Sequence, residues 1–449
     1  MVKKKKLNPA SQIALGFLAV ILFGTFLLCL PWSNKNGQWF SFVDSLLTST
    51  SAVCVTGLTV VDLAMHFTLF GQIIVLLLIQ IGGLGFITLT SLIFLMIGKK
   101  ITFESRLTIK ESLNQGSIQG VVKLVKKIII FVFTTELVGS LIFMPSFVNI
   151  YGWGRGIFTS IFISISSFCN AGFDILGDGK TPFLSLTNFS QNAFVLIPIM
   201  LLIVLGGIGF LVVFELPNIF KKQKISTNSK IVLGVTSVLV FAGALLFAIL
   251  EWNNAQTIGN MSVGGKILNS FFLSISPRTA GFATLNYSSL SPASLTLTNL
   301  LMFIGGSPAS TAGGIKTTTF FVLLLVLFKN TNKKGDFVFH KKKVPNKLIQ
   351  KCLRVLSLAL VMICASTFLI CAIDGLSIES VLFETISAIS TVGLTLGITP
   401  ILSVFSKILI SLLMFIGRVG AVTLTLALGS IEDPLCDEID YPDAKLIVG

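Results

Sequence analysis

The stretch Val55-Thr56-Gly57-Leu58 decides the fold, because the chain repeats it in altered form three more times. A Ser/Thr-rich apolar segment again runs into an isolated glycine at Gly172, Gly281 and Gly393, at intervals of 115, 109 and 112 residues. The other three tetrapeptides are Asn170-Ala171-Gly172-Phe173, Thr279-Ala280-Gly281-Phe282 and Thr391-Val392-Gly393-Leu394. A spacing this regular predicts one structural unit that is used four times along the chain.

The composition is that of a membrane protein. Of the 449 residues, 53% are hydrophobic and only 12% are charged. Four apolar runs approach the ~20 helical residues that cross a bilayer core of ~30 Å, namely residues 13–30, 128–143, 231–250 and 355–373. We therefore expect an all-α polytopic membrane protein. The first run lacks a small-residue cleavage site and is interpreted as a retained span rather than a secretory signal.

The net charge of +14 is concentrated in alternate loops. Of the 33 Lys and Arg residues, 24 fall in residues 3–6, 99–127, 221–230 and 329–354. Because cytoplasmic loops carry the excess of cations, these segments and both termini are predicted to be cytoplasmic. Topology alone accounts for the basic charge, with a lipid or partner site in these loops as the alternative, and nucleic acid is not expected.

Each quarter of the chain has the pattern of a span, a short apolar segment, a glycine turn and a second span. The short segments are too short to cross the bilayer and must dip in and return on the same side; they are residues 40–53, 157–169, 267–275 and 378–389. Non-helical backbone at membrane depth is tolerated only inside protein or beside a wet cavity. We expect eight transmembrane helices and four re-entrant pore helices, with pseudo-fourfold symmetry around one pore.

The repeats divide the chain into five parts. These are residues 1–98 (repeat 1), 99–220 (a cytoplasmic linker and repeat 2), 221–328 (repeat 3, with a broken second span), 329–430 (a cytoplasmic loop and repeat 4) and 431–449 (an acidic cytoplasmic tail). A further glycine follows in each second span, 25, 34, 24 and 24 residues after the loop glycine, at Gly82, Gly206, Gly305 and Gly417. Close helix packing is the favoured interpretation for Gly82, Gly83, Gly206 and Gly207.

The four glycine loops have the chemistry of a monovalent cation site. Backbone carbonyls can replace the water shell of such an ion, and glycine permits the backbone angles that turn them inward. Hydroxyls such as those of Thr56, Thr279 and Thr391 can brace the loops or supply oxygen. The four equivalent positions hold no carboxylates, which favours K⁺ or Na⁺ over a divalent ion. We therefore predict that the four tetrapeptides form a selectivity filter, with K⁺ at Gly57, Gly172, Gly281 and Gly393, and that this chain needs no organic cofactor.

With these loops the sequence resembles the KtrB-type subunits of Ktr potassium uptake systems, in the superfamily that includes TrkH and the plant HKT transporters. The resemblance covers nearly the whole chain and implies a bacterial plasma-membrane transporter. Sodium-preferring members often carry serine at the first filter glycine, so Gly57 implies a potassium-selective pore. The family also implies a homodimer on a cytosolic ring of RCK-type regulatory subunits that bind the nucleotide. Na⁺ is a candidate coupling ion, as in a symporter.

The second span of repeat 3 is interrupted by a polar, glycine-rich stretch. The stretch contains four glycines and a proline. Relative to alanine, each glycine destabilises a helix by ~1 kcal/mol and the proline by ~3 kcal/mol, so a break is expected there. We predict an intramembrane gating loop beneath the filter, with a simple helix kink as the alternative. Its predicted residues are Gly305, Gly306, Ser307, Gly313, Gly314 and Lys316.

Three charged residues fall at membrane depth. A central arginine in a span costs at least ~2.5 kcal/mol on insertion scales, so Arg418 is expected to face the pore or to pair with backbone carbonyls, with snorkelling to an interface as the alternative. Arg278 and Glu384 lie in the pore segments of repeats 3 and 4. They are expected to support the filter, either as an ion pair or through separate polar partners.

The pattern favours a transporter over an enzyme. The isolated His66 and His340 and the scattered acidic residues supply neither a nucleophile–base pair nor a set of metal ligands. Repeats that begin and end on the same side favour a channel-like pore, while an alternating-access or sodium-permeable cation carrier is the alternative.

Overall fold

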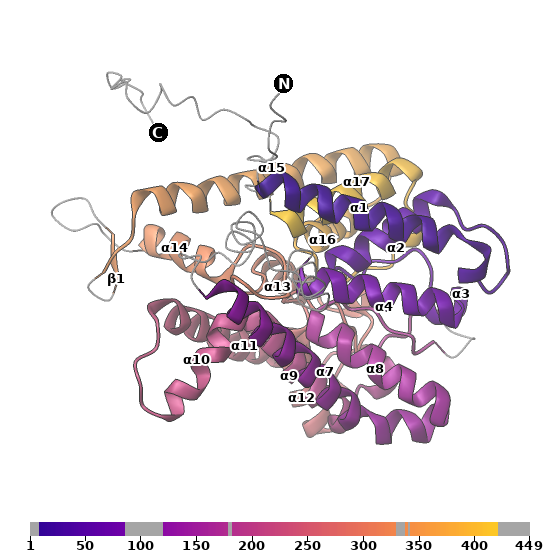
Figure 1. The fold of residues 1–449 in the computed structure, drawn as a ribbon, viewed down its shortest axis with the longest axis horizontal. Coiled ribbons are helices and arrows are strands. Elements are labelled where there is room, and N and C mark those ends of the chain that lie inside the picture. The colour runs from indigo at the N-terminus through magenta and orange to yellow at the C-terminus, as the bar shows by residue number, and fades with distance from the viewer. Residues whose placement is uncertain (1–8, 86–119, 178–181, 329–336, 340–341, 421–449) are drawn as a thin grey trace.

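The computed structural model describes residues 9–85, 120–177, 182–328, 337–339 and 342–420. Residues 3–6, most of the basic stretch 99–127, residues 329–336 and the acidic tail 431–449 lie outside this part of the chain. The described residues are mostly helical (Figure 1). The all-α expectation is modified by one short antiparallel ladder, in which β1 (Val338–Phe339) pairs with β2 (Lys342–Lys343).

Each repeat begins with a long apolar helix. These are α1 (Pro9–Cys29), α7 (Val121–Tyr151), α11 (Thr227–Glu251) and α15 (Asn346–Asp374). All four are long and apolar enough to cross a membrane. A bent helix pair in repeat 2 would add a fifth span. The count of eight spans therefore stays a prediction.

A shorter helix packs against each long one, where the sequence predicts a pore helix. These are α2 (Phe42–Cys54), α8 (Trp153–Cys169), α12 (Val263–Ile275) and α16 (Ile378–Ile389). Serine caps start two of them, since Ser262 Oγ accepts from Gly265 N–H and Ser377 Oγ from Ser380 N–H, as helix N-termini favour. Figure 1 shows α15 beside α16 and α17 on one side of the molecule and α7 beside α8 on another.

Among the described residues, the second spans of repeats 2 and 3 are interrupted. The helices that follow the pore loops are α4 (Leu69–Leu84), α9 (Ala193–Ile208), α13 (Pro292–Phe303) and α17 (Val404–Val419). α4, α9 and α17 each end at a glycine with positive φ: Gly85 (78°), Gly209 (98°) and Gly420 (91°). Past Gly209 the chain turns by 105° into α10 (Phe210–Phe220).

The sequence analysis expected a break in the second span of repeat 3 but did not expect the bend in repeat 2. In repeat 3 the break is longer, because 13 residues separate α13 from α14 (Thr317–Phe328). The signal was present in the sequence: Gly85, Gly209 and Gly420 each lie three residues after the span glycine. Glycine adopts positive φ at little steric cost, which ends a helix.

The span glycines let α4, α9 and α17 approach the pore helices. A Cβ atom added to Gly82 would collide with the carbonyl oxygen of Val53, and one added to Gly206 with that of Phe168. Gly417 meets the carbonyl of Ile389 in the same way. This close backbone approach supports the packing interpretation of Gly82 and Gly206.

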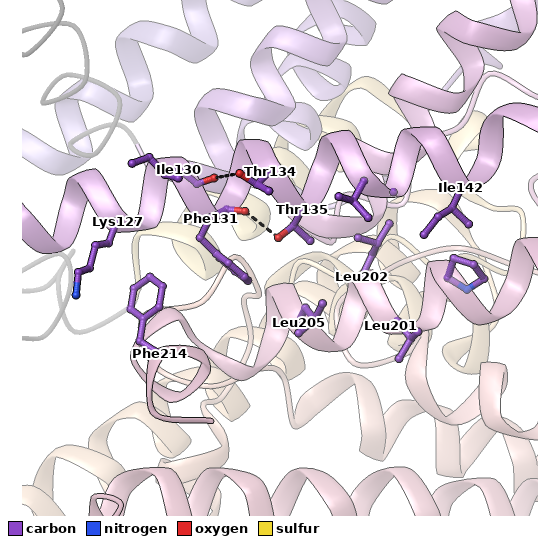
Figure 2. Close-up of a pocket in the computed structure, with 13 residues that line it drawn as sticks. Lys127, Ile130, Phe131, Thr134, Thr135, Ile142, Leu201, Leu202, Leu205 and Phe214 are labelled. Atoms are coloured by element: carbon purple, nitrogen blue, oxygen red, sulfur yellow. Dashed lines mark hydrogen bonds between the residues drawn. The ribbon is translucent and has the colours of Figure 1, made fainter. Parts of the chain in front are cut away.

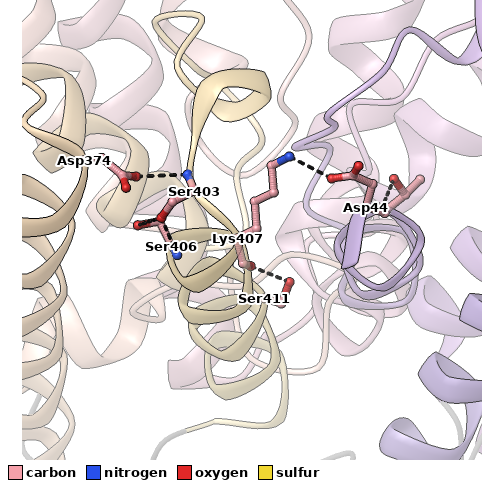
Figure 3. A network of polar contacts seen from close by, with 7 residues as sticks. Asp44, Asp374, Ser403, Ser406, Lys407 and Ser411 are labelled. Atoms are coloured by element: carbon pink, nitrogen blue, oxygen red, sulfur yellow. Dashed lines mark hydrogen bonds and ion pairs between the residues drawn. The ribbon is translucent and has the colours of Figure 1, made fainter. Parts of the chain in front are cut away.

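An ion pair joins the first repeat to the last. Lys407 Nζ of α17 lies 2.8 Å from Asp44 Oδ1 in the first turn of α2 (Figure 3). Only 13% and 19% of these side chains are exposed, so water screens the pair weakly. Asp44 also lies at the N-terminus of its helix, where the helix dipole favours an anion.

We predict that Asp44 and Lys407 stabilise the fold jointly. A double-mutant cycle with Asp44→Asn and Lys407→Met, followed by thermal unfolding in detergent, should give a coupling energy of about 1 kcal/mol, at the upper end of the range for exposed pairs. Additive effects of the two substitutions would contradict a direct interaction.

Candidate selectivity filter

The four pore helices lead into loops with the same backbone geometry. Two residues before each glycine, the chain adopts a left-handed conformation, with φ of 58° at Val55, 60° at Asn170, 72° at Thr279 and 50° at Thr391. Positive φ is uncommon outside glycine and unfavourable for β-branched residues, at ~1–3 kcal/mol each. The same strain at the same position of all four loops indicates a functional constraint.

The glycines themselves also have positive φ, and the four loops meet in a closed ring. A Cβ atom added to Gly57 would lie 2.6 Å from the carbonyl oxygen of Ala171, and one on Gly172 would lie 2.7 Å from that of Ala280. A Cβ atom added to Gly281 would collide with the carbonyl oxygen of Val392, and one added to Gly393 with that of Thr56. Each glycine thus faces the carbonyl of the next loop, and the fourth loop returns to the first.

The carbonyls of this ring are free of hydrogen bonds. The oxygens of Thr56, Ala171, Ala280 and Val392 accept none from any residue that the structure describes. Buried backbone carbonyls are nearly always paired, so four unpaired ones around one point form a site for a group with positive charge. The predicted filter glycines are therefore brought together, with four oxygen donors among them.

Serines of the pore helices hold the loops from behind. Ser51 Oγ accepts from Gly57 N–H at 2.9 Å and Ser387 Oγ from Gly393 N–H at 3.0 Å. In the other two loops the serine donates instead, from Ser166 Oγ to Phe173 O at 2.7 Å and from Ser276 Oγ to Phe282 O. We name these four residues the brace serines.

The brace serines were missed by sequence reasoning, which considered the loop threonines. Their signal is a serine six residues before Gly57, Gly172 and Gly393, and five before Gly281. The hydroxyls of Thr56, Thr279 and Thr391 are instead buried with no hydrogen-bond partner among the described residues. These three threonines therefore do not brace the loops through hydrogen bonds to the described residues, and their hydroxyls remain candidate oxygen ligands for the ion.

The glycine-rich stretch of repeat 3 packs against the glycine loop of repeat 4. A Cβ atom on Gly313 would collide with Thr391 Oγ1 and lie 3.0 Å from the carbonyl oxygen of Ser390. Within the loop, Ser307 Oγ and Thr317 Oγ1 are 3.0 Å apart, and Lys316 Nζ donates to Ala312 O at 2.7 Å. Gly305 packs on Gly313 and Gly314, while Gly306 packs on Ala312.

Repeat 2 supplies the other side of this loop. Ser307 N–H donates to Gly207 O at 2.9 Å, Thr311 N–H to Gly206 O at 3.2 Å, and Phe210 N–H to Ala309 O at 2.9 Å. The break after α9 exposes the carbonyls of Gly206 and Gly207, and the loop of repeat 3 satisfies them. The two interruptions therefore stabilise each other.

Arg418 connects this loop to repeat 1. Its guanidinium donates to the carbonyl oxygens of Thr311 and Gly82. This is the backbone-carbonyl pairing that the sequence analysis considered for a central arginine. One side chain of repeat 4 thus bridges repeats 1 and 3.

The ion pair considered for Arg278 and Glu384 is absent: the described residues include both side chains, and they are not within 4 Å of each other. Glu384 instead accepts from Thr399 Oγ1, and Arg278 Nε is buried without a hydrogen-bond partner. The separate-partner alternative therefore fits Glu384.

The comparisons with known proteins show the family to which this chain belongs. The family model described as cation transport protein, TrkH, matches residues 8–434. The potassium/sodium uptake protein NtpJ of Enterococcus hirae is 39% identical over 99% of this chain and 98% of its own. The Ktr system potassium uptake protein B of Bacillus subtilis is 37% identical over 100% and 98%.

A solved structure, the potassium transporter TrkH from Vibrio parahaemolyticus, has the same fold. It aligns with a TM-score of 0.73 over 96% of this chain and 86% of that one, at 18% identity. The chain is therefore a multi-pass membrane protein and belongs to the TrkH family of cation transport proteins.

Proposed function

We propose that this chain is the membrane subunit of a potassium uptake system and conducts K⁺ through the ring of filter carbonyls. The observation that carries the proposal is that the carbonyls of Thr56, Ala171, Ala280 and Val392 have no hydrogen-bond donor among the described residues, and that each faces the filter glycine of the preceding loop. An ion that has lost its water shell supplies the missing partner.

Selectivity for K⁺ is proposed from Gly57 and from the relatives, which are named for potassium uptake. The printed name of the Enterococcus hirae relative also includes sodium. A sodium-permeable pore is therefore the second candidate, and Na⁺ coupling of K⁺ uptake is a third possibility to be measured. An alternating-access carrier remains the alternative to a gated pore.

The assembly is proposed in the same way. The name of a Ktr system supports a subunit that works with further components. We propose a homodimer in a bacterial plasma membrane, with both termini cytoplasmic and an RCK-type nucleotide-binding ring beneath it. Eight spans and pseudo-fourfold symmetry belong to this proposal and are supported by the four long helices and the matching loop geometry.

Gating is proposed to reside in residues 305–317. The loop lies under Thr391 and is anchored on one side by Gly206 and Gly207 and on the other by Arg418. In this position it obstructs an ion that leaves the filter toward the cytoplasm, and its displacement would open the path.

Gly57→Ser tests the filter. We expect loss of growth rescue of a potassium-uptake-deficient bacterium at low K⁺ and a roughly tenfold lower preference for Rb⁺ over Na⁺ in proteoliposome uptake, the ratio given by ~1.4 kcal/mol. There are two physical reasons: the added Cβ atom would collide with the Ala171 carbonyl oxygen, and Gly57 has a φ of 104°, which is strained for any residue with a side chain. Gly37→Ser is the matched control, because Gly37 also has positive φ but has open space around it. Equal behaviour of the two variants would argue against the filter.

Ser51→Ala tests the brace serines. It leaves the Gly57 N–H without its acceptor, at ~1–3 kcal/mol for a buried group, so we expect a lower ratio of Rb⁺ to Na⁺ uptake. Ser45→Ala in the same helix is the control, because Ser45 Oγ is buried and has no partner among the described residues. If both variants lose selectivity alike, or neither does, the brace has no role in selectivity.

Removal of residues 313–317 tests the gate. We expect faster Rb⁺ flux into proteoliposomes, because the segment under Thr391 is gone. Arg418→Gln should raise flux too, since it releases the Thr311 anchor, whereas Arg354→Gln on an exposed position of α15 should not. Unchanged flux in the deletion variant, with normal thermal unfolding, would rule out a gate.

A further inference from the structure

An exposed groove runs between α7 and α9 (Figure 2). Its volume is about 640 Å³, within the ~300–1,000 Å³ of ligand pockets. The break after α9 shapes it, because the turn at Gly209 directs α10 away and leaves Phe214 at one end. We call it the α7–α9 groove.

The walls of the groove are apolar and open to the bilayer. Ile130 and Leu201 are 57% and 59% exposed. The two hydroxyls in the wall are already used, because Thr134 Oγ1 donates to Ile130 O at 2.7 Å and Thr135 Oγ1 to Phe131 O at 2.8 Å (Figure 2). Water needs two to four polar partners, so the groove suits a hydrocarbon chain.

Charge is present at one end only. Among the described residues, Lys127 is the single charged residue that lines the groove, and it lies at the end occupied by Phe214 (Figure 2). It forms no ion pair with any residue that the structure describes. Lys123, one helical turn earlier, is also exposed. An apolar slot with an unpaired cation at its mouth complements an amphiphile that has one anionic head.

We propose that the α7–α9 groove binds an anionic phospholipid, with an acyl chain along the walls and the phosphate on Lys127. The groove is also linked to the proposed gate through α10. Phe214 of α10 lines the groove, and the N–H of Phe210, the first residue of α10, donates to Ala309 O of the loop. Bound lipid would thereby restrain α10 and the loop. This coupling rests on the proposed function, whereas the binding itself does not.

The binding test is native mass spectrometry of the full chain, titrated with phosphatidylglycerol or phosphatidylcholine. We expect wild type to retain more phosphatidylglycerol, and Lys127→Gln to bind it about fivefold more weakly, the effect of one cation near a lipid surface. Lys126→Gln is the matched control, since Lys126 is an exposed neighbour outside the groove. Leu201→Trp should fill the groove and lower the binding of both lipids. Leu137→Trp should leave the binding unchanged, because Leu137 is 60% exposed but lies outside the groove.

Equal retention of the two lipids by wild type, or equal effects of Lys126→Gln and Lys127→Gln, would overturn the proposal. If Leu201→Trp dissociates a dimer and leaves lipid retention unchanged, a second copy of the chain occupies the groove and the proposal is also overturned. Lipid retention is measured without transport. A negative result in the potassium assays would therefore not affect the conclusion about lipid binding.

Discussion

The constraint on which the structure depends is that a backbone carbonyl at membrane depth must find a partner. Helices satisfy their carbonyls internally, so the loops after the pore helices are the exception. The brace serines satisfy part of this backbone, but the carbonyls of Thr56, Ala171, Ala280 and Val392 are left to one another. Four partial negative charges held this close repel one another, and the K⁺ of the proposed filter would relieve that repulsion.

The brace also shows that the ring is not a true fourfold object. In repeats 1 and 4, which are neighbours in the ring, the serine accepts from the filter glycine N–H. In repeats 2 and 3 it donates to the carbonyl after the glycine. A serine hydroxyl can do either because it is both donor and acceptor. One half of the filter is thus fixed at its glycines and the other half at its phenylalanines.

Much of this architecture could be predicted from the sequence because apolar length and glycine spacing are local properties. The pore helix α16 matches its predicted bounds, and the break before Thr317 was expected from composition. The bend at Gly209 was missed because Gly206, in the same apolar run, was interpreted as a site of close helix packing, which is compatible with a continuous helix.

Side-chain partners were the least predictable part of the site. Arg278 and Glu384 were considered as an ion pair because both were expected at membrane depth. A shared depth does not determine the distance between two helices, and Glu384 instead accepts a hydrogen bond from Thr399 of its own repeat. The brace serines were overlooked for the opposite reason, since serine is common in apolar pore segments and its role depends on which backbone group lies opposite.

Two buried charged residues in this protein, Glu136 and Arg418, are hydrogen-bonded by uncharged groups from other repeats. Both carboxylate oxygens of Glu136 on α7 accept from Gln80 Nε2 of α4 at 3.1 Å. Arg418 is held by carbonyls of Gly82 and Thr311. The Thr311 carbonyl belongs to the repeat 3 loop, and a buried charge that loses such a partner requires compensation. If this loop is the gate proposed above, its displacement removes the Thr311 carbonyl from Arg418, and water must then enter to solvate the guanidinium. In that proposal, opening of the loop and hydration of the space beside the filter are one event.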